Sequence, residues 1–373
     1  MSLVSIIKTP DYEPETLRRA VEKHFAAVDI DSDLKPGMKV LIKPNLISAH
    51  KPAHAATTHP ELLRAIILAL HERGITDVTI ADSSGGPYTT AMIKNVYSAC
   101  GLKPLGEIAT LNYSTGWRSV PAAEGSAVGS FNVIDPIADA DYIINAAKLK
   151  THSMTTLSAG VKNMFGSIPG LQKPEMHYRF PDVGDFSNML IDLFRTVAPR
   201  ITILDAVDGM EGDGPNAGTP KHMGLTFASR DAFTQDWIAS GLMGIEPESV
   251  PLLKAAKERG LARPDEVELV GDSGVSPDPF RMPKTVAFDF MARFPKFMQK
   301  PLNRFVRGAL KPLPKVEKQK CVGCGKCAES CPPQIIRIKN GKAKFTRKGC
   351  ISCFCCQEMC PAKAIDTKRR IRL

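Results

Sequence analysis

The first 275 or so residues alternate short apolar, β-branched runs with longer segments in which apolar residues recur at helical spacing. This alternation is typical of a mostly parallel β-sheet flanked by helices, so it predicts an α/β domain over residues 1–275. The predicted strands are residues 4–7, 39–42, 78–81, 142–145, 201–204, 225–228 and 267–270. The predicted helices are residues 14–28, 60–73, 92–99, 186–197, 232–242 and 250–259.

Residues 276–320 break this pattern, because seven prolines interrupt a basic segment. The prolines argue against one long helix, so we interpret residues 276–314 as a basic, proline-rich tether. Five aromatic side chains of this segment are expected to pack on the main domain, and the alternative is an amphipathic surface that touches a membrane face or a partner. They are Phe288, Phe290, Phe294, Phe297 and Phe305.

Eight of the ten cysteines form two copies of one pattern near the C-terminus, 29 residues apart (350 − 321). The copies are Cys321-x2-Cys324-x2-Cys327-x3-Cys331-Pro332 and Cys350-x2-Cys353-x2-Cys356-x3-Cys360-Pro361. This spacing predicts a small α+β ferredoxin-like module with two 4Fe-4S clusters over residues 315–373, in which the fourth cysteine of each run binds the other cluster. The predicted ligands are Cys321, Cys324, Cys327 and Cys360 for cluster one, and Cys350, Cys353, Cys356 and Cys331 for cluster two.

Two cysteines lie outside the pattern. Cys100 is expected to pack inside the α/β domain. Cys355, directly before Cys356, is interpreted as a small buried residue, with a substitute ligand or a redox-sensitive thiol as the alternatives.

The net charge of +10 conceals a division along the chain. Residues 1–279 hold 26 Lys/Arg and 34 Asp/Glu (net −8), whereas residues 280–373 hold 23 and 5 (net +18). Lysines around anionic clusters offset their charge and can attract an acidic redox partner such as a ferredoxin or flavodoxin. Nucleic-acid binding is a weaker interpretation, because only Phe345 and Phe354 lie near the cysteines as stacking residues.

Composition sets the broad class. The chain is 43% apolar and 24% charged, which is ordinary for a globular protein, and it contains no run of about 18 apolar residues that would predict a membrane span. The first two dozen residues are too charged for a signal peptide, and thiol ligands favour a reducing compartment. We therefore expect a cytoplasmic protein.

Polar segments follow the predicted strands of the α/β domain, at the edge where open α/β sheets bind ligands. The predicted substrate-binding residues are Lys43, Asn45, Asp82, Ser83, Ser84, Gly85, Gly86, Lys148, Lys150, Lys162, Asn163 and Asp208. Lysines suit a carboxylate or phosphate, and a Ser-Gly loop can hold an anion on backbone N–H groups. Neither a Walker loop nor the Gly-x-Gly-x-x-Gly dinucleotide pattern is present, so ATP and NAD have little support.

Acid–base work at this edge is assigned to His152, His59 and Lys43. Lys148, Lys150 and His152 alternate, so in an extended chain they point to one face. Three acidic residues follow another strand and could bind a hard cation, although the spacing is not that of a calcium loop. They are Asp208, Glu211 and Asp213.

The ordered motifs resemble the domain-of-unknown-function family numbered 362, in its subset fused to a C-terminal pair of 4Fe-4S motifs. The resemblance rests on Lys43-Pro-Asn45, Thr58-His59-Pro60, Asp82-Ser-Ser-Gly-Gly86, Lys148-x-Lys150-Thr-His152, Gly160-Val-Lys162-Asn163 and Asp205-x-x-Asp208-Gly209. It covers about residues 3–230 and 315–368 and implies a cytoplasmic iron–sulfur protein of prokaryotes, without a settled reaction. A looser similarity to the N-terminal domain of nickel-pincer lactate racemases favours a small organic acid as ligand.

Two functions compete at this point. In the first, an oxidoreductase passes single electrons from the clusters to an anionic small molecule in the α/β crevice. In the second, the chain is an electron-transfer adaptor whose α/β domain docks a separate reductase and performs no chemistry.

Overall fold

The computed structural model describes residues 2–272, 274–285, 313–346 and 348–368. Within them, a nine-stranded sheet has the strand order β11-β1-β10-β9-β7-β2-β3-β4, with β8 paired to β7. Its strands are β1 (Ser2–Lys8), β2 (Val40–Pro44), β3 (Val78–Ile80), β4 (Thr110–Leu111), β7 (Tyr142–His152), β8 (Thr156–Ser158), β9 (Ile201–Glu211), β10 (Thr219–Ser229) and β11 (Val267–Gly271). Strands β2, β3, β4, β7 and β9 are parallel, whereas β10 is antiparallel to both of its neighbours.

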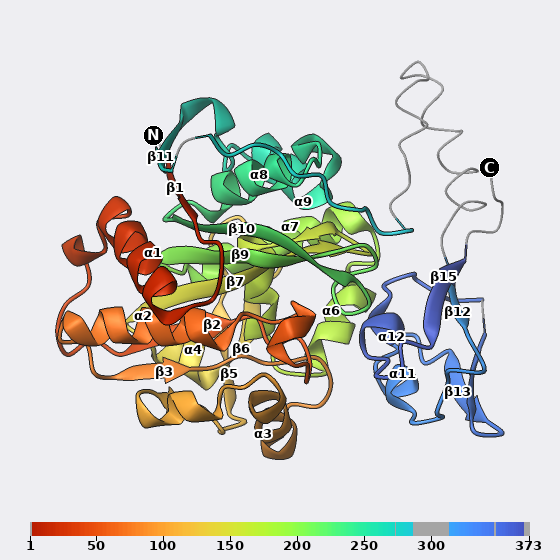
Figure 1. The fold of residues 1–373 in the computed structure, drawn as a ribbon. Helices are drawn as coiled ribbons and strands as arrows, with labels where there is room; N and C mark the ends of the chain where they lie inside the picture. Colours follow the sequence, from red (N-terminus) through yellow and green to blue (C-terminus); the bar gives the residue numbers. More distant parts are fainter. Residues whose placement is uncertain (1, 273, 286–312, 347, 369–373) are drawn as a thin grey trace.

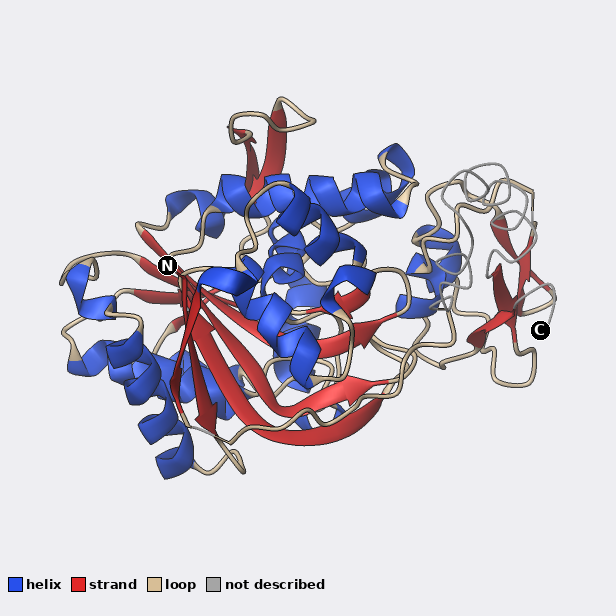
Figure 2. Cartoon of the chain, turned by 90° about the horizontal axis from the view of Figure 1, so that it is seen from above, coloured by secondary structure: helices blue, strands red, loops and turns tan. Residues whose placement is uncertain are grey.

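Helices cover both faces of this sheet (Figures 1 and 2). One hydrophobic core packs α1 (Pro14–Ala27), α2 (Pro60–Glu72) and α3 (Thr90–Ala99) on one face, and a second core packs α7 (Val183–Val197), α8 (Ala232–Leu242) and α9 (Pro251–Glu258) on the other. Helix α2 shows why: Leu62, Ile66 and Ala69 recur at helical spacing and are buried. The predicted α/β fold with a mostly parallel sheet is confirmed.

The remaining short elements connect these layers. A two-stranded ribbon joins β5 (Trp117–Pro121) and β6 (Ser130–Ile134), and it is followed by α4 (Asp135–Asp139). Helices α5 (Gly160–Asn163) and α6 (Gln172–Arg179) lie between β8 and α7 and supply much of the site described below. The described helices include none that is both long and apolar enough to cross a membrane.

Two central strands are longer than predicted. The sequence places the end of β7 at Asn145, but the strand continues to His152, and all 11 of its residues are buried. Strand β9 likewise continues past Leu204 to Glu211. Lys148 and Lys150 therefore lie inside a strand instead of in a loop after it. The pairing of β7 with β9 shifts register between these two lysines.

The C-terminal module (residues 313–368) lies beside the carboxyl end of β7 (Figure 1). It contains two small antiparallel ribbons, β12 (Leu313–Val316) with β15 (Ile365–Lys368) and β13 (Ile336–Lys339) with β14 (Lys342–Phe345). Two short helices, α11 (Lys326–Glu329) and α12 (Cys355–Glu358), each carry cysteines of one run. The small α+β module matches the predicted fold.

Most of the predicted tether, including its five phenylalanines, lies outside the described residues. In the described part, Phe280 is buried in the core of the α/β domain, against Gly209. Residues of this segment also bond to the 211–214 loop: the backbone N–H of Gly212 donates to the Arg281 carbonyl at 2.7 Å.

Candidate functional site

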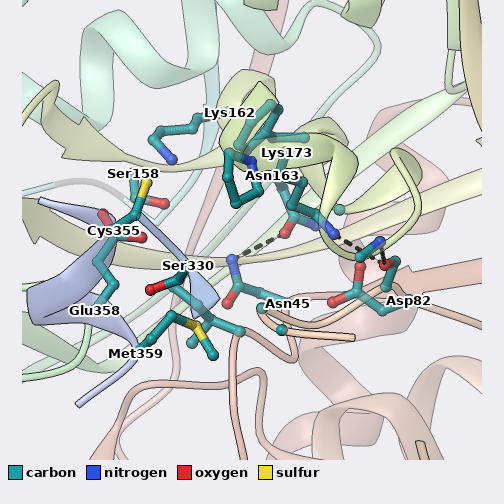
Figure 3. A pocket seen from close by; sticks show the side chains of 18 of the residues that line it. Asn45, Asp82, Ser158, Lys162, Asn163, Lys173, Ser330, Cys355, Glu358 and Met359 are labelled. Carbon is teal, nitrogen blue, oxygen red and sulfur yellow. Dashed lines mark hydrogen bonds between the residues drawn. The ribbon is translucent and has the colours of Figure 1, made fainter. Parts of the chain in front are cut away.

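A cavity lies between the carboxyl edge of the sheet and the C-terminal module (Figure 3). Its volume is about 90 Å³, and since one buried water needs about 10–15 Å³, it has room for several waters or one small organic molecule. The α/β domain contributes Lys43, Asn45, Ile47, Asp82, Ser83, Gly85, Gly86, Ser158, Lys162, Asn163, Phe165, Gly166, Gly170, Lys173, Pro174 and His177, and the module contributes Ser330, Cys355, Glu358 and Met359. We call this space the interdomain cavity.

Lys43 at the end of β2 forms a buried ion pair within the cavity wall. Its ammonium donates to Asp82 Oδ1 at 2.7 Å and to the Pro44 carbonyl at 2.9 Å, while Asp82 Oδ2 accepts the Leu46 N–H at 2.7 Å. Burial lowers the pKa of Lys43, and the neighbouring carboxylate opposes that effect. These two charges satisfy each other, so they shape the wall more than they offer charge to a ligand.

Lys173 on α6 holds its ammonium in the cavity through two contacts with the serine loop. It donates to Ser83 Oγ at 2.9 Å and to the Ser84 carbonyl at 3.2 Å. Ser83 Oγ also accepts the Gly170 N–H at 2.8 Å, so its own hydroxyl proton is free to point elsewhere. Burial lowers the pKa of Lys173 to about 7, which makes it both a cation and a possible proton donor near neutral pH.

Lys162 on α5 faces the C-terminal module across the cavity, toward Ser158 and Cys355 (Figure 3). It donates no hydrogen bond to any described residue, although its ammonium lies 5.5 Å from the centre of the Phe165 ring. Burial lowers its pKa, and the nearby carboxylate of Glu358 opposes that shift. The positive charge of Lys162 is therefore available to a ligand in the interdomain cavity.

His177 lines the same cavity one helical turn after Lys173. Its ring stacks on Phe186, with the ring centres 4.2 Å apart, and burial lowers its pKa to about 3, so the ring is neutral. Its Nδ1 is buried and has no hydrogen-bond partner in the described part of the chain. A ligand with a hydrogen-bonding group would satisfy it.

An asparagine network fixes the floor of the cavity. Asn45 donates to Asn163 Oδ1 at 2.9 Å, and Asn163 donates to Asn145 Oδ1 at 2.7 Å. Lys150 donates to Asn45 Oδ1 at 2.9 Å and to the Ala56 carbonyl at 2.7 Å. Burial lowers the pKa of Lys150 to about 7, but its ammonium lies behind this network and does not line the cavity.

The module closes the cavity by direct contacts. Met359 packs on Gly85 and Gly86, where an added Cβ at Gly85 would lie 2.6 Å from the Met359 sulfur. On the other side of the contact, Asn216 donates to the Glu358 carbonyl at 2.6 Å. Gly85 therefore allows the close approach that seats the module against the serine loop.

The predicted binding residues divide into two groups. Eight of them line the interdomain cavity: Lys43, Asn45, Asp82, Ser83, Gly85, Gly86, Lys162 and Asn163. Four do not: Ser84, Lys148, Lys150 and Asp208. Sequence reasoning missed Lys173, His177, Ser158, Cys355 and Glu358 as cavity residues.

Lys148 belongs to a separate buried cluster on the same strand. It donates to Asp205 Oδ2 and to the Tyr12 hydroxyl, both at 2.8 Å. His59 stacks on the Tyr12 ring at 3.7 Å, and its Nδ1 accepts the Glu61 N–H at 3.3 Å as the cap of α2. The structure thus gives His59 a structural place away from the cavity.

His152 also lies outside the cavity lining, at the end of β7. Its Nδ1 accepts the Met154 and Thr155 N–H groups, so Nε2 carries the proton. Nε2 is 3.3 Å from Glu358 Oε1, but among the described residues neither atom forms a hydrogen bond. Burial lowers the pKa of His152 well below its usual value. Lys148, Lys150 and His152 each contact a different partner, and their common face stays a prediction.

The three acidic residues considered for a cation site, two at the end of β9 and one after it, are each paired with a basic side chain. Asp208 lies 2.8 Å from His222, Glu211 pairs with Arg281 at 2.7 Å, and Asp213 lies 3.3 Å from Lys284. No group of three or more His, Cys, Asp or Glu side chains among the described residues is close enough to hold a single metal ion.

The eight patterned cysteines line two further cavities. The first is lined by Cys321, Cys324, Cys327 and Cys360, and the second by Cys331, Cys350, Cys353 and Cys356. This grouping is the one that the crossed ligand assignment requires. Backbone N–H groups point at two of the sulfurs, from Ala343 to Cys321 Sγ at 3.4 Å and from Ala364 to Cys360 Sγ at 3.2 Å. Four thiols around each apolar cavity fit a 4Fe-4S cluster.

Two sets of four cysteines in a small module beside the α/β sheet define the class of iron–sulfur proteins. The family model described as "Domain of unknown function (DUF362)" matches residues 40–241, and that of a "4Fe-4S dicluster domain" matches residues 313–361. The chain belongs to the DUF362 family and carries an iron–sulfur domain of ferredoxin type, as the motifs predicted.

Individual relatives add context. The thylakoid-associated protein sll1697 of Synechocystis sp. is 27% identical over 321 residues, covering 80% of this chain and 97% of that protein. Ferredoxin-2 of Desulfomicrobium norvegicum is 46% identical over 28 residues, which are 8% of this chain and 48% of the ferredoxin.

Two solved structures show a distant resemblance to this chain. The lactate racemase apoprotein from Thermoanaerobacterium thermosaccharolyticum has a TM-score of 0.39 and 11% identity over 66% of this chain. A protein from Thermotoga maritima has a TM-score of 0.35 and 12% identity over 61% of this chain. The match spans 58% of each of those structures, and similarity this low defines no shared activity.

Proposed function

We propose that the protein is an oxidoreductase in which a small anionic molecule binds in the interdomain cavity and receives electrons one at a time. The observation that carries this proposal is the placement of two adjacent residues on α12. Cys355 lines the interdomain cavity, and Cys356 lines the second cysteine cavity. Only neighbouring residues of one helix separate the proposed electron source from the proposed substrate.

The electron source would be two 4Fe-4S clusters, each held by the four cysteines that line one cysteine cavity. A bound cluster of this type exchanges one electron at a time. Cluster ligands that are free thiols also support the proposal that the protein works in a reducing compartment such as the cytoplasm.

The charge of the cavity favours an anion. Lys43 and Asp82 neutralise each other, which leaves Lys162 and Lys173 facing the single carboxylate of Glu358. A carboxylate or similar anionic group placed between the two lysines would balance their positive charge in a site with little water. The neutral ring of His177 and the Ser83 hydroxyl would orient the rest of the molecule.

Proton supply is assigned to Lys173. Adding an electron pair to an organic acceptor takes up protons as new bonds to hydrogen form. Lys173 lines the cavity, and burial lowers its pKa to about 7, so it can give up its proton at neutral pH. The two histidines first assigned to this role do not reach the cavity.

An anaerobic screen of small organic and inorganic anions against the iron-reconstituted protein tests the proposal. A ligand at 100 times its Kd should raise the free energy of unfolding by about 2.7 kcal/mol. We expect Lys162→Met and Lys173→Met to lose this stabilisation, and the exposed control Lys103→Met to keep it. The same ligand should reoxidise the dithionite-reduced wild type.

The adaptor function is the second candidate. It is favoured by Lys43 and Lys150, because the ammonium group of each already bonds to a protein group and is not available to a substrate. The same experiment separates the two candidates. If no anion stabilises the protein and Lys162→Met only weakens binding of a protein partner, the oxidoreductase proposal is wrong.

A further inference from the structure

An exposed apolar tip at the first cysteine cavity has no role in the proposed chemistry. Val322, between Cys321 and Cys324, is 70% exposed, the highest value among the exposed large apolar side chains of the described residues. Ile338 on β13 is 37% exposed, and both side chains line the first cysteine cavity. We call Val322 and Ile338, with the exposed Cys324, the Val322 tip.

The two cysteine cavities differ in how close they lie to solvent. Cys324 of the first set is exposed, whereas Cys353 and Cys356 of the second set are buried. The second set also adjoins α12, whose other side closes the interdomain cavity. An electron carrier in solution can therefore approach the first set at the Val322 tip, while the second set faces the proposed substrate.

The module that carries the tip is positively charged. Lys326 and Lys339 follow Cys324 and Ile338 closely in the chain, are exposed, and form no ion pair with another described residue. Over residues 313–366 the sequence holds 11 Lys/Arg and 4 Asp/Glu, a net charge of +7 (11 − 4). An exposed apolar contact on a positively charged module is complementary to an acidic protein surface.

We propose that the Val322 tip is the docking surface for an acidic one-electron carrier protein, so that electrons enter at the first cysteine set and leave through the second. In each encounter the carrier is oxidised by one electron and the protein is reduced by one, with no bond formed or broken. This proposal rests on the assignment of a cluster to each cysteine set, and not on the chemistry of the interdomain cavity.

Nucleic acid fits the same charge less well. Binding of single strands relies on exposed aromatic side chains on which bases stack. In the described part of the module, Phe354 is buried and Phe345 is half-buried, and residues 313–366 contain no Trp or Tyr. The apolar centre of the tip is small and aliphatic, which suits a protein contact.

The test measures reduction of the reconstituted full chain by reduced flavodoxin, an acidic one-electron carrier, in the absence of any substrate. The variant is Lys326→Glu/Lys339→Glu, and the matched control is Lys103→Glu/Lys254→Glu, which reverses two exposed lysines of the α/β domain. Iron content is measured first, so a failure of the cluster assignment is seen separately. Reduction by dithionite, a small molecule, reports whether the clusters themselves are intact.

We expect the tip variant to lose about tenfold or more of its reduction rate by flavodoxin at low salt, with the difference vanishing at high salt. The control pair should keep the wild-type rate, and dithionite should reduce all three proteins equally. An equal loss in the control pair, or a wild-type rate independent of salt, would overturn the proposal. So would competition by single-stranded DNA, or a concentration-dependent dimer that the tip variant abolishes.

Discussion

At the scale of single residues, the buried lysines of the crevice differ in which groups accept the hydrogen bonds of their ammonium groups. Lys43, Lys148 and Lys150 donate to carboxylate, carbonyl or amide oxygens of the protein, so they stabilise the fold around the site. Lys162 makes no such hydrogen bond, and Lys173 holds only a serine hydroxyl and a carbonyl. Only these last two retain charge for a ligand.

The lowered pKa of Lys173 predicts a specific pH dependence of stability. Its folded pKa is about 7 and its ordinary value is 10.5, so the unfolded chain binds more protons between these values. The free energy of unfolding should therefore rise with pH across this interval, by about 1–3 kcal/mol between about pH 7 and pH 9, and Lys173→Met should lack that part of the rise. Paired denaturation curves of the two proteins measure it. If the free energies of unfolding of the two proteins changed with pH in parallel, the lowered pKa of Lys173 would be contradicted.

The sequence could predict the type of residue at the site but not which lysines remain available. Lys43 and Lys162 look alike in the sequence, and they are separated by the ion pair of Lys43 with Asp82, which lies in the loop after the neighbouring strand β3. Lys173 and His177 were missed, although their spacing of four residues places them on one helix face. The polar composition of residues 172–179 hid that helix, whose few apolar residues give little periodicity.

At the scale of elements, a tight turn depends on the absence of a side chain. The turn at Met164–Ser167 passes so close to the Lys43–Asp82 pair that a Cβ on Gly166 would lie 2.6 Å from the lysine ammonium and closer still to Asp82 Oδ1. Both charges are buried, so neither can move into water. The position of the turn is therefore tied to the position of the ion pair.

Gly166→Ala should consequently break the buried pair and lower the free energy of unfolding by about 3–5 kcal/mol. Chemical denaturation measures the change. Gly129→Ala is the matched control, because an added Cβ there meets nothing within 4 Å, and it should change stability by less than about 0.5 kcal/mol. A small effect of Gly166→Ala would show that the turn can shift without cost.

Helix α12 allows a second comparison between neighbouring residues. Cys356→Ser removes a proposed ligand and should lower the iron content of the reconstituted chain from about eight atoms toward about four. Cys355→Ser faces the interdomain cavity instead and should keep about eight. Iron and sulfide analysis with absorption spectra checks both variants. If Cys355→Ser loses iron as well, Cys355 is a ligand and the crossed assignment must change.

The element pattern was predictable where apolar and polar positions alternate clearly. It failed on β7, because two lysines inside an 11-residue buried strand look like the start of a loop. Tertiary partners, Asp205 and Asn45, keep those lysines in the strand. The cysteine spacing was predictable for the opposite reason, since cluster ligands are set by short, repeated local intervals.

At the scale of the whole molecule, the interdomain cavity has walls from two domains. Sequence reasoning located the sheet edge and the cysteine runs, but it could not show that Met359 and Glu358 would close the crevice. That closure depends on long-range docking, through Asn216 and Gly85, between segments more than 130 residues apart.

Removing iron should therefore loosen the serine loop as well as the module. The Gly85 N–H donates to the Ile47 carbonyl at 2.9 Å where Met359 packs on this loop, and Met359 lies in the chain between the proposed ligands Cys356 and Cys360. Hydrogen exchange of residues 83–86 should be faster in the iron-free chain than in the reconstituted one, whereas the core of α7 should be unchanged. Equal exchange at residues 83–86 would mean that the module docks without its clusters.

The adjacent positions of Cys355 and Cys356 on α12 have a thermodynamic consequence. A cluster held in the second cysteine cavity would gain a negative charge on reduction, next to the proposed anion site in the interdomain cavity, so reduction should weaken anion binding there. By reciprocity, the bound anion must lower the midpoint potential of that centre by the same free energy. Substrate would then bind best to the oxidised protein, and each electron that arrives would help to expel a product that keeps its negative charge.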